Sequence, residues 1–210
     1  TLVVSRTDEG FTNFGRFNVS YIENVILTGS LNLNVVGDDF ANTITSNSGS
    51  NRLSGGKGDD VYLSITSDDV IVEAADQGND SATAVGENVT LAANVETLVL
   101  GTGVVRGIGN GSGGTVVGNT LNNILVSGAG VDSLAGGAGN DTYIINDTSD
   151  GIFERGTLNG INDGTDKVQT SVSFTLPGGV ENLELTGSGD NRVATGNELA
   201  NVITGSSGND

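Results

Sequence analysis

The 210-residue sequence contains no Cys, His, Met or Trp, and only one Pro. Without Cys the chain can form no disulfide, no thiolate metal site and no Cys nucleophile. Without His it lacks a Ser-His-Asp triad, a zinc site built on imidazole and an imidazole acid or base. No apolar run approaches the length of about 18–20 residues that a membrane-spanning helix needs. These absences predict a non-catalytic segment with no membrane insertion.

Basic residues are also scarce, with 8 Lys and Arg against 26 Asp and Glu, for a formal net charge of −18. Such a charge repels nucleic acid phosphates and anionic membrane surfaces, so neither is an expected partner. Only 35% of the residues are hydrophobic and 4% aromatic, which argues against a large conventional core. What the chain can attract is cations, hard ones in particular, because its ligand side chains all offer oxygen.

Two phrases recur along the chain. The first reads IENVILTG, VETLVLGTG and VENLELTG at 22–29, 95–103 and 180–187, and the second reads VVGDDFANTIT, VVGNTLNNILV and VATGNELANVIT at 35–45, 116–126 and 193–204. The second phrases are 81 and 78 residues apart, measured at Asn42, Asn123 and Asn201. The chain therefore holds about two and a half tandem units of about 80 residues.

These spacings predict four segments. They are a partial N-terminal unit at 1–34, a first unit at 35–115, a second unit at 116–192 and the start of a third at 193–210. Unequal spacing of the first phrases comes from two Gly-rich stretches, at 103–114 and around 156–164, which we predict to be loops on a regular scaffold.

A nine-residue period lies inside each unit, over 37–72 and 118–153. With GGKGDDVYL at 55–63 as the frame, the eight sixth positions are all Asn or Asp and the eight eighth positions are all apolar. The sixth positions are Asn42, Asn51, Asp60, Asp69, Asn123, Asp132, Asp141 and Asp150, and the eighth are Ile44, Leu53, Tyr62, Ile71, Leu125, Leu134, Tyr143 and Ile152.

Such a period fits neither a helix stripe nor a hairpin ladder. It predicts an all-β fold, a parallel β-roll or β-solenoid of short strands joined by Gly-rich turns, with the eighth side chain pointing inward. Tyr62 and Tyr143 are then core residues. Alternate coils turn on the same side, so residues 18 apart should be neighbours, as in the pair Asn42 and Asp60. Stacked carboxylates repel one another unless a cation lies between them. Together with the backbone carbonyls of the Gly-rich turns, they predict a site for a hard ion with flexible coordination geometry, such as Ca²⁺.

Several segments resemble the RTX, or hemolysin-type, calcium-binding repeat. GGKGDDVYL at 55–63 and GGAGNDTYI at 136–144 match its GGxGxDxUx nonapeptide, SGAGVDSLA at 127–135 is a near match, and GSSGND at 205–210 begins another. The resemblance implies a parallel β-roll with calcium between its turns. It also implies export, by type I secretion from a Gram-negative bacterium, to the extracellular space or cell surface.

The resemblance and the carboxylate spacing together give a candidate ligand set. Sixth-position Asp side chains would bind the ion, Gly residues of the turns would lend carbonyls, and the Glu of a following D-x-I-x-E tail would close a terminal site. The candidates are Asp60, Asp141, Asp69, Asp132, Asp150, Gly55, Gly56, Gly58, Gly136, Gly137, Gly139, Glu73 and Glu154, with Asn51 as an uncharged oxygen ligand. The alternative is a set of turns capped without metal, which Asp and Asn also favour.

Three functions remain open at this point. The first is a calcium-binding structural or adhesive region of a large secreted or cell-surface bacterial protein, which folds when calcium binds. The second is a non-catalytic repeat module of a secreted lipase, protease or polysaccharide-modifying enzyme. The third is a self-assembling surface-layer or filament subunit. Self-association and contact with a cell-surface or matrix polysaccharide stay open as partners.

Overall fold

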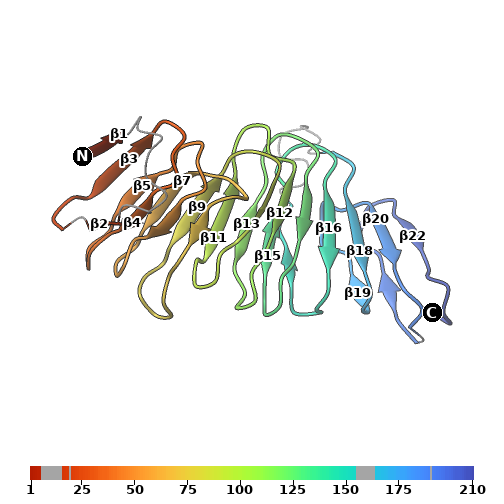
Figure 1. Cartoon of the computed structure of the whole chain (residues 1–210). Helices are drawn as coiled ribbons and strands as arrows, with labels where there is room; N and C mark the ends of the chain where they lie inside the picture. The colour runs from red at the N-terminus through yellow and green to blue at the C-terminus, as the bar shows by residue number, and fades with distance from the viewer. Residues whose placement is uncertain (6–15, 19, 155–163, 190) are drawn as a thin grey trace.

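The chain is a solenoid built almost entirely of strands and turns. The computed structural model describes residues 1–5, 16–18, 20–154, 164–189 and 191–210, which form 22 short strands and no helix. Every strand pairing in this part is parallel and joins strands two apart in the chain, so the backbone coils and successive coils stack (Figure 1). The predicted all-β parallel solenoid is confirmed.

The odd-numbered strands form the first wall of the solenoid. Nine of them make one sheet: β1 (Leu2–Ser5), β3 (Asn24–Thr28), β5 (Thr43–Thr45), β7 (Val61–Ile65), β9 (Ser81–Ala84), β11 (Thr97–Leu100), β13 (Thr115–Val117), β15 (Ser133–Ala135) and β17 (Gly151–Ile152). A separate pair follows them, β19 (Phe174–Thr175) and β21 (Ala194–Thr195).

The even-numbered strands form the second wall. Four of them make one sheet: β2 (Arg16–Asn18), β4 (Asn34–Val36), β6 (Arg52–Ser54) and β8 (Val70–Ile71). Seven more make the next: β10 (Asn88–Thr90), β12 (Arg106–Ile108), β14 (Ile124–Val126), β16 (Thr142–Ile145), β18 (Lys167–Thr170), β20 (Asn182–Leu185) and β22 (Val202–Thr204). Each sheet break falls after the strand of a D-x-I-x-E rung, β8 or β17, where the connecting turn is longer.

A narrow core lies between the two walls. The eighth-position side chains point into it as predicted, with Ile44, Leu53, Tyr62, Leu125, Leu134 and Tyr143 fully buried. Parallel register stacks them in rows, for example Ile44 beside Tyr62 and Leu125 beside Tyr143. Burying one such side chain contributes roughly 1.5–3 kcal/mol, so a single rung gains little and stability depends on stacking.

The Gly-rich stretch at 103–114 is not a loop, and that prediction was wrong. Residues 106–108 form β12, which pairs with β10 and β14 in the second wall. The stretch therefore adds one nine-residue half-coil. Gly107 occupies the inward position, where a Cβ would lie 2.8 Å from Cγ1 of Val116 and 2.9 Å from Cδ2 of Leu100. The second predicted loop, around 156–164, lies outside the described residues except for Gly164.

The extra half-coil changes which edge of the solenoid each unit presents. Asp60 precedes β7 of the first wall, whereas its counterpart Asp141, 81 residues later, precedes β16 of the second wall. Equivalent turns of the two units consequently lie at opposite edges. The described residues include no helix that could cross a bilayer.

Candidate metal centre

Sixth-position residues form ladders along the edges of the solenoid, and the predicted 18-residue neighbours are confirmed. In each pair the backbone N–H of the earlier residue donates to a carboxylate oxygen of the later one. The N–O distances are 2.7 Å for Asn42 and Asp60, 2.9 Å for Asn51 and Asp69, 2.7 Å for Asn123 and Asp141, and 3.0 Å for Asp132 and Asp150. Backbone donors thus hold one oxygen of each Asp in place.

The Asn members of the ladders close their turns with their own amides. Asn42 accepts from the N–H of Asp38 at 3.1 Å and donates to the carbonyl of Ile22. The amide of Asn51 accepts from the N–H of Leu33 and donates to several neighbours, among them Oγ of Ser46. Both amide groups are engaged in hydrogen bonds, as is that of Asn123.

Two of the candidate Asp ligands act as turn caps in the structure. Asp69 accepts hydrogen bonds at both oxygens, at Oδ1 from Asn51 and Ser46 and at Oδ2 from the N–H and hydroxyl of Thr66. Asp150 accepts from Asp132 at Oδ1 and from Asp147 at Oδ2. Every oxygen of these two carboxylates therefore has a protein donor.

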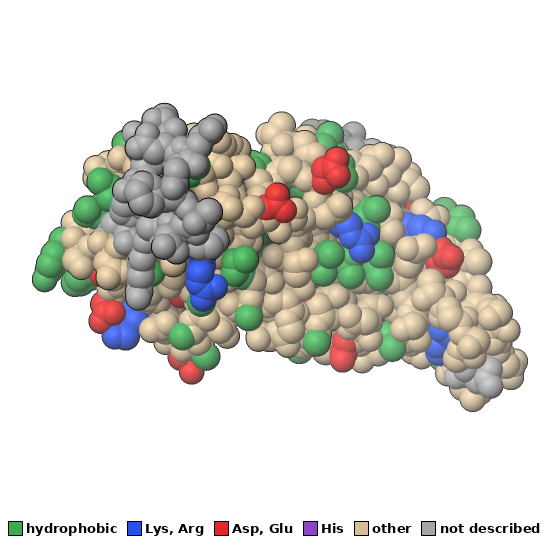
Figure 2. All heavy atoms as spheres, viewed as in Figure 1, with side chains coloured by type: hydrophobic (Ala, Val, Ile, Leu, Met, Phe, Trp, Pro, Cys, Tyr) green, Lys and Arg blue, Asp and Glu red, His purple; other side chains and the backbone are tan. Residues whose placement is uncertain are grey.

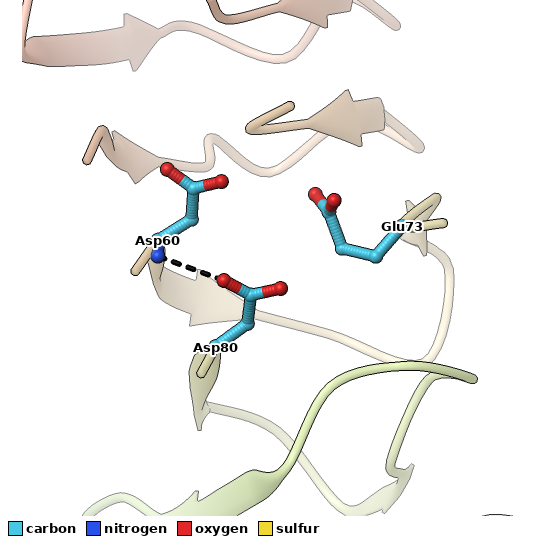
Figure 3. Close-up of side chains that lie close together, drawn as sticks. All are labelled: Asp60, Glu73 and Asp80. Carbon is cyan, nitrogen blue, oxygen red and sulfur yellow. Dashed lines mark hydrogen bonds between the residues drawn. The ribbon is translucent and has the colours of Figure 1, made fainter. Parts of the chain in front are cut away.

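Asp60 belongs to a different arrangement, which we name the first carboxylate cluster: Asp60, Glu73 and Asp80. One carboxylate oxygen from each lies within 4.8 Å of the others, and all three side chains are buried. Figure 3 shows that they approach from three separate segments, with the N–H of Asp60 donating to Oδ1 of Asp80 at 2.8 Å. Three acids at this spacing make a strongly negative pocket.

The second carboxylate cluster, Asp141, Glu154 and Asp166, repeats this arrangement at the opposite edge. Its oxygens again lie within 4.8 Å of one another, with Asp141 and Asp166 buried and Glu154 half-buried. The N–H of Asp141 donates to Oδ1 of Asp166 at 2.7 Å, as Asp60 does to Asp80. The structure thus brings the predicted Asp60 and Glu73 together, and likewise Asp141 and Glu154.

A tyrosine hydroxyl fixes the Glu of each cluster. The hydroxyl of Tyr62 donates to Oε1 of Glu73, and the N–H of Gly55 donates to both groups, at 2.5 Å and 2.8 Å. Tyr143 likewise donates to Oε1 of Glu154 and accepts from Gly136. Burial and the neighbouring Glu73 raise the pKa of Tyr62, so the hydroxyl stays protonated. Both Tyr are core residues as predicted, yet their hydroxyls also reach the clusters.

Burial dominates the electrostatics of the clusters. Burial is the main cause that raises the pKa of Asp60 to about 7, and the charges of Asp80 and Glu73 act in the same direction. The hydrogen bond from the N–H of Asn42 lowers this pKa in part. Burial likewise raises the pKa of Asp80 to about 6 and that of Asp141 to about 6. Carboxylates in this situation need either a proton or a cation.

The glycines of the two intact nonapeptides have separate roles. The backbones of Gly56, Gly58, Gly137 and Gly139 have φ between 99° and 116°, a region that other residues rarely adopt. Gly55 and Gly136 instead permit close approach, since a Cβ would lie 1.9 Å from Oδ2 of Asp60 and 2.2 Å from Oδ2 of Asp141. The first Gly therefore keeps space open beside the second oxygen of the Asp.

These second oxygens provide the test of whether calcium fits. Among the described residues, no group donates a hydrogen bond to the buried atoms Oδ2 of Asp60, Oε2 of Glu73, Oδ2 of Asp141 or Oδ1 of Asp132. A buried charged oxygen without a donor is costly, whereas a hard cation would satisfy it. The donor set is all oxygen with no nitrogen or sulfur, which suits calcium. The residues present fit the ion.

Asp80 and Asp166 are cluster members that the periodicity does not identify. They follow the sixth-position Asp by 20 and 25 residues rather than 18, because longer turns intervene. The signal that could have found them is local: each ends a G-x-D phrase and directly precedes a strand, β9 or β18.

Comparisons with known proteins agree with this chemistry. The profile of the RTX calcium-binding nonapeptide repeat matches four copies, over residues 35–64, 108–144 and 195–210. A curated relative, "Endo-1,3-1,4-beta-glycanase ExsH" of Rhizobium meliloti (strain 1021), is 37% identical over 99 residues, which cover 47% of this chain and 20% of the relative. No solved structure matches. The chain therefore contains the RTX calcium-binding nonapeptide repeat in four copies, and its acidic clusters could hold a calcium ion.

Proposed function

We propose that the chain is a non-catalytic module that folds outside the cell when it binds calcium. The observation that carries this proposal is the pair of carboxylate clusters, in which Oδ2 of Asp60, Oε2 of Glu73 and Oδ2 of Asp141 accept no hydrogen bond from the residues that the structure describes. On the face shown in Figure 2 the acidic side chains are scattered, while seven of the acids are buried inside the solenoid. Acids are seldom buried without a partner, so the fold is expected to depend on the ion.

The proposed cycle follows from charge and core size. In the cytosol, where calcium is scarce, a net charge of −18 and a core one side chain deep per rung favour the unfolded chain. Outside the cell, calcium at millimolar concentration neutralises the clusters and the coils stack. An unfolded chain is also the form suited to type I secretion, which is typical of Gram-negative proteins with these repeats.

The repeat boundaries fit the same proposal. Units at 35–115 and 116–192 would each contribute one cluster, with partial units at 1–34 and 193–210 on either side. Beyond the two clusters, Asp132 is the best remaining ligand, because no residue that the structure describes donates to its buried Oδ1. Asp69, Asp150 and Asn51 would then serve as turn caps.

The experiment is a comparison of the folded state with calcium, magnesium and chelator. Far-ultraviolet circular dichroism and size-exclusion chromatography should report a compact β structure with calcium and an expanded chain after chelation. Magnesium should be a poor substitute because it demands a smaller octahedral shell and sheds water reluctantly. A β spectrum and elution volume unchanged by chelator would refute the proposal.

A second candidate is a structural module attached to a secreted glycan-cleaving enzyme. The relative named as a glycanase favours it, although this chain corresponds to only 20% of that protein. The chain folded in calcium should release no reducing sugar from 1,3-1,4-β-glucan but should be retained by the insoluble polysaccharide. Catalytic release by the purified chain would contradict the non-catalytic assignment, and absence of retention would favour the structural or adhesive role.

A further inference from the structure

The last turn pair carries an arginine at the position that holds Asn or Asp in the other ladders. Arg192 and Asp210 are 18 residues apart, like Asn42 and Asp60. Their turns stack in the same way, since the N–H of Asn191 donates to the carbonyl of Asn209 at 2.7 Å. Arg192 is therefore a ladder residue rather than a surface side chain, and it is 8% exposed.

Five oxygens surround its guanidinium group. Nε donates to the carbonyl of Gly189 at 3.1 Å, and Nη1 donates to the carbonyls of Ser171, at 3.3 Å, and Thr186. Nη2 donates to the hydroxyl of Ser206 and forms an ion pair with Oδ1 of Asp210 at 3.2 Å. Carbonyls, a hydroxyl and a carboxylate are the oxygen donors that a hard cation would use.

The guanidinium group gives this turn pair a permanent positive charge. Arginine remains protonated in proteins, so it occupies this space at any calcium concentration. A divalent ion within bonding distance of the same oxygens would be repelled by it. We propose that Arg192 is the resident cation of the last turn pair, and that this pair folds without calcium although the RTX profile extends over residues 195–210.

Calcium stoichiometry tests this proposal directly, with equilibrium dialysis or calorimetry of the full 210-residue chain and calcium chloride as the probe. Asp210→Asn should leave the number of bound ions unchanged, because the guanidinium already balances the carboxylate. Arg192→Asp gives this pair two acids, as in the pair Asp132 and Asp150, and should add one bound ion. Arg192→Lys retains the positive charge and should add none. Circular dichroism in calcium checks that each variant is folded.

Two results would overturn the proposal: loss of one ion in Asp210→Asn, or a folded Arg192→Asp chain that gains none. If Arg192→Asp fails to fold, the Asp210→Asn measurement alone decides. The proposal for Arg192 rests on the calcium-dependent function only for the comparison with the other turns. Asp141→Asn tests that function separately. It should reduce calcium binding if the function is correct, independently of the results for Arg192 and Asp210.

Discussion

Neutralising one acid of the first carboxylate cluster should stabilise the chain in chelator and remove most of the stability that calcium adds. Asp60 is the suitable position because it is 1% exposed and its Oδ2 accepts no hydrogen bond from the described part of the chain. Asp60→Asn retains an oxygen that can accept from the N–H of Asn42, and its new amide group can donate to Glu73 or Asp80. The substitution therefore removes a charge with little change of shape.

The magnitude in chelator follows from two routes. Two unit charges 4.8 Å apart at an effective dielectric constant of about 20 repel by about 3.5 kcal/mol. Burial raises the pKa of Asp60 from 3.8 to about 7, which corresponds to about 4 kcal/mol for a charge that is kept ionised. We expect Asp60→Asn to raise the free energy of unfolding in chelator by about 2–3 kcal/mol. This is less than either figure, because partial protonation already relieves part of the repulsion.

With calcium, the loss of binding energy offsets this gain. An ion at a concentration 100-fold above its dissociation constant stabilises the folded chain by about 2.7 kcal/mol. Loss of a charged ligand weakens binding and removes most of this contribution. The calcium-induced gain in unfolding free energy should therefore shrink in Asp60→Asn while the chelated form gains stability.

Urea denaturation followed by circular dichroism measures both effects. The chelated samples contain a fixed concentration of the stabilising osmolyte trimethylamine N-oxide, so that the chain, which is expected to unfold without calcium, starts folded. Asp59→Asn is the matched control, because Asp59 is exposed, adjacent in sequence and outside the cluster, and its Oδ1 accepts from the N–H of Asn79. The control should shift neither value by more than about 0.5 kcal/mol. The reasoning is refuted if Asp60→Asn destabilises the chelated chain or leaves the calcium-induced gain intact.

Three further predictions concern protons, the tyrosine and the inserted half-coil. Burial raises the pKa of Asp60 to about 7, so in chelator the folded state binds protons that the unfolded state does not. The free energy of unfolding in chelator should therefore fall as pH rises from about 5 to about 7.5. Calcium affinity should rise over the same pH range. A chelated chain that is less stable at pH 5 in urea melts would contradict this. Tyr62→Phe removes the hydroxyl that fixes Glu73 and should weaken calcium binding about 10-fold in a calcium titration. A variant that binds calcium as tightly as the unchanged chain would contradict this role of the hydroxyl. Gly107→Val should lower the unfolding free energy by about 2 kcal/mol, with and without calcium, whereas Gly111→Val, with no atom near its Cβ position, should not.

The nine-residue period was sufficient to predict the fold and the inward row, because each strand has one buried position and the same chemistry recurs there. It failed where the buried position needs no apolar side chain. Gly107 lies inward in β12, and the side chains of Val116 and Leu100 occupy the space that its own would fill. The glycine content therefore indicated a loop where the chain forms a strand.

The ligand set could be predicted only in part for a related reason. Asp60 and Glu73 lie on or next to the regular lattice, but Asp80 follows a longer turn and a register shift between β7 and β9. Ser64, with a φ of 61°, lies within that shift. Spacing alone also cannot separate a carboxylate that caps a turn, such as Asp69, from one with a free oxygen, since both occupy the same repeat position.

The turn pairs differ in what neutralises the polar groups between them, and this difference determines which parts of the fold depend on calcium. Amides such as that of Asn42 satisfy their turns permanently, and the guanidinium group of Arg192 supplies a permanent positive charge. Among the described residues, the buried oxygens that accept no hydrogen bond include Oδ2 of Asp60, Oε2 of Glu73 and Oδ2 of Asp141 in the clusters, and Oδ1 of Asp132 outside them. The extra half-coil containing Gly107 places one cluster at each edge, before β7 and before β16. We therefore expect calcium to stabilise both edges of the solenoid, whereas turns closed by Asn amides or by Arg192 should need no ion.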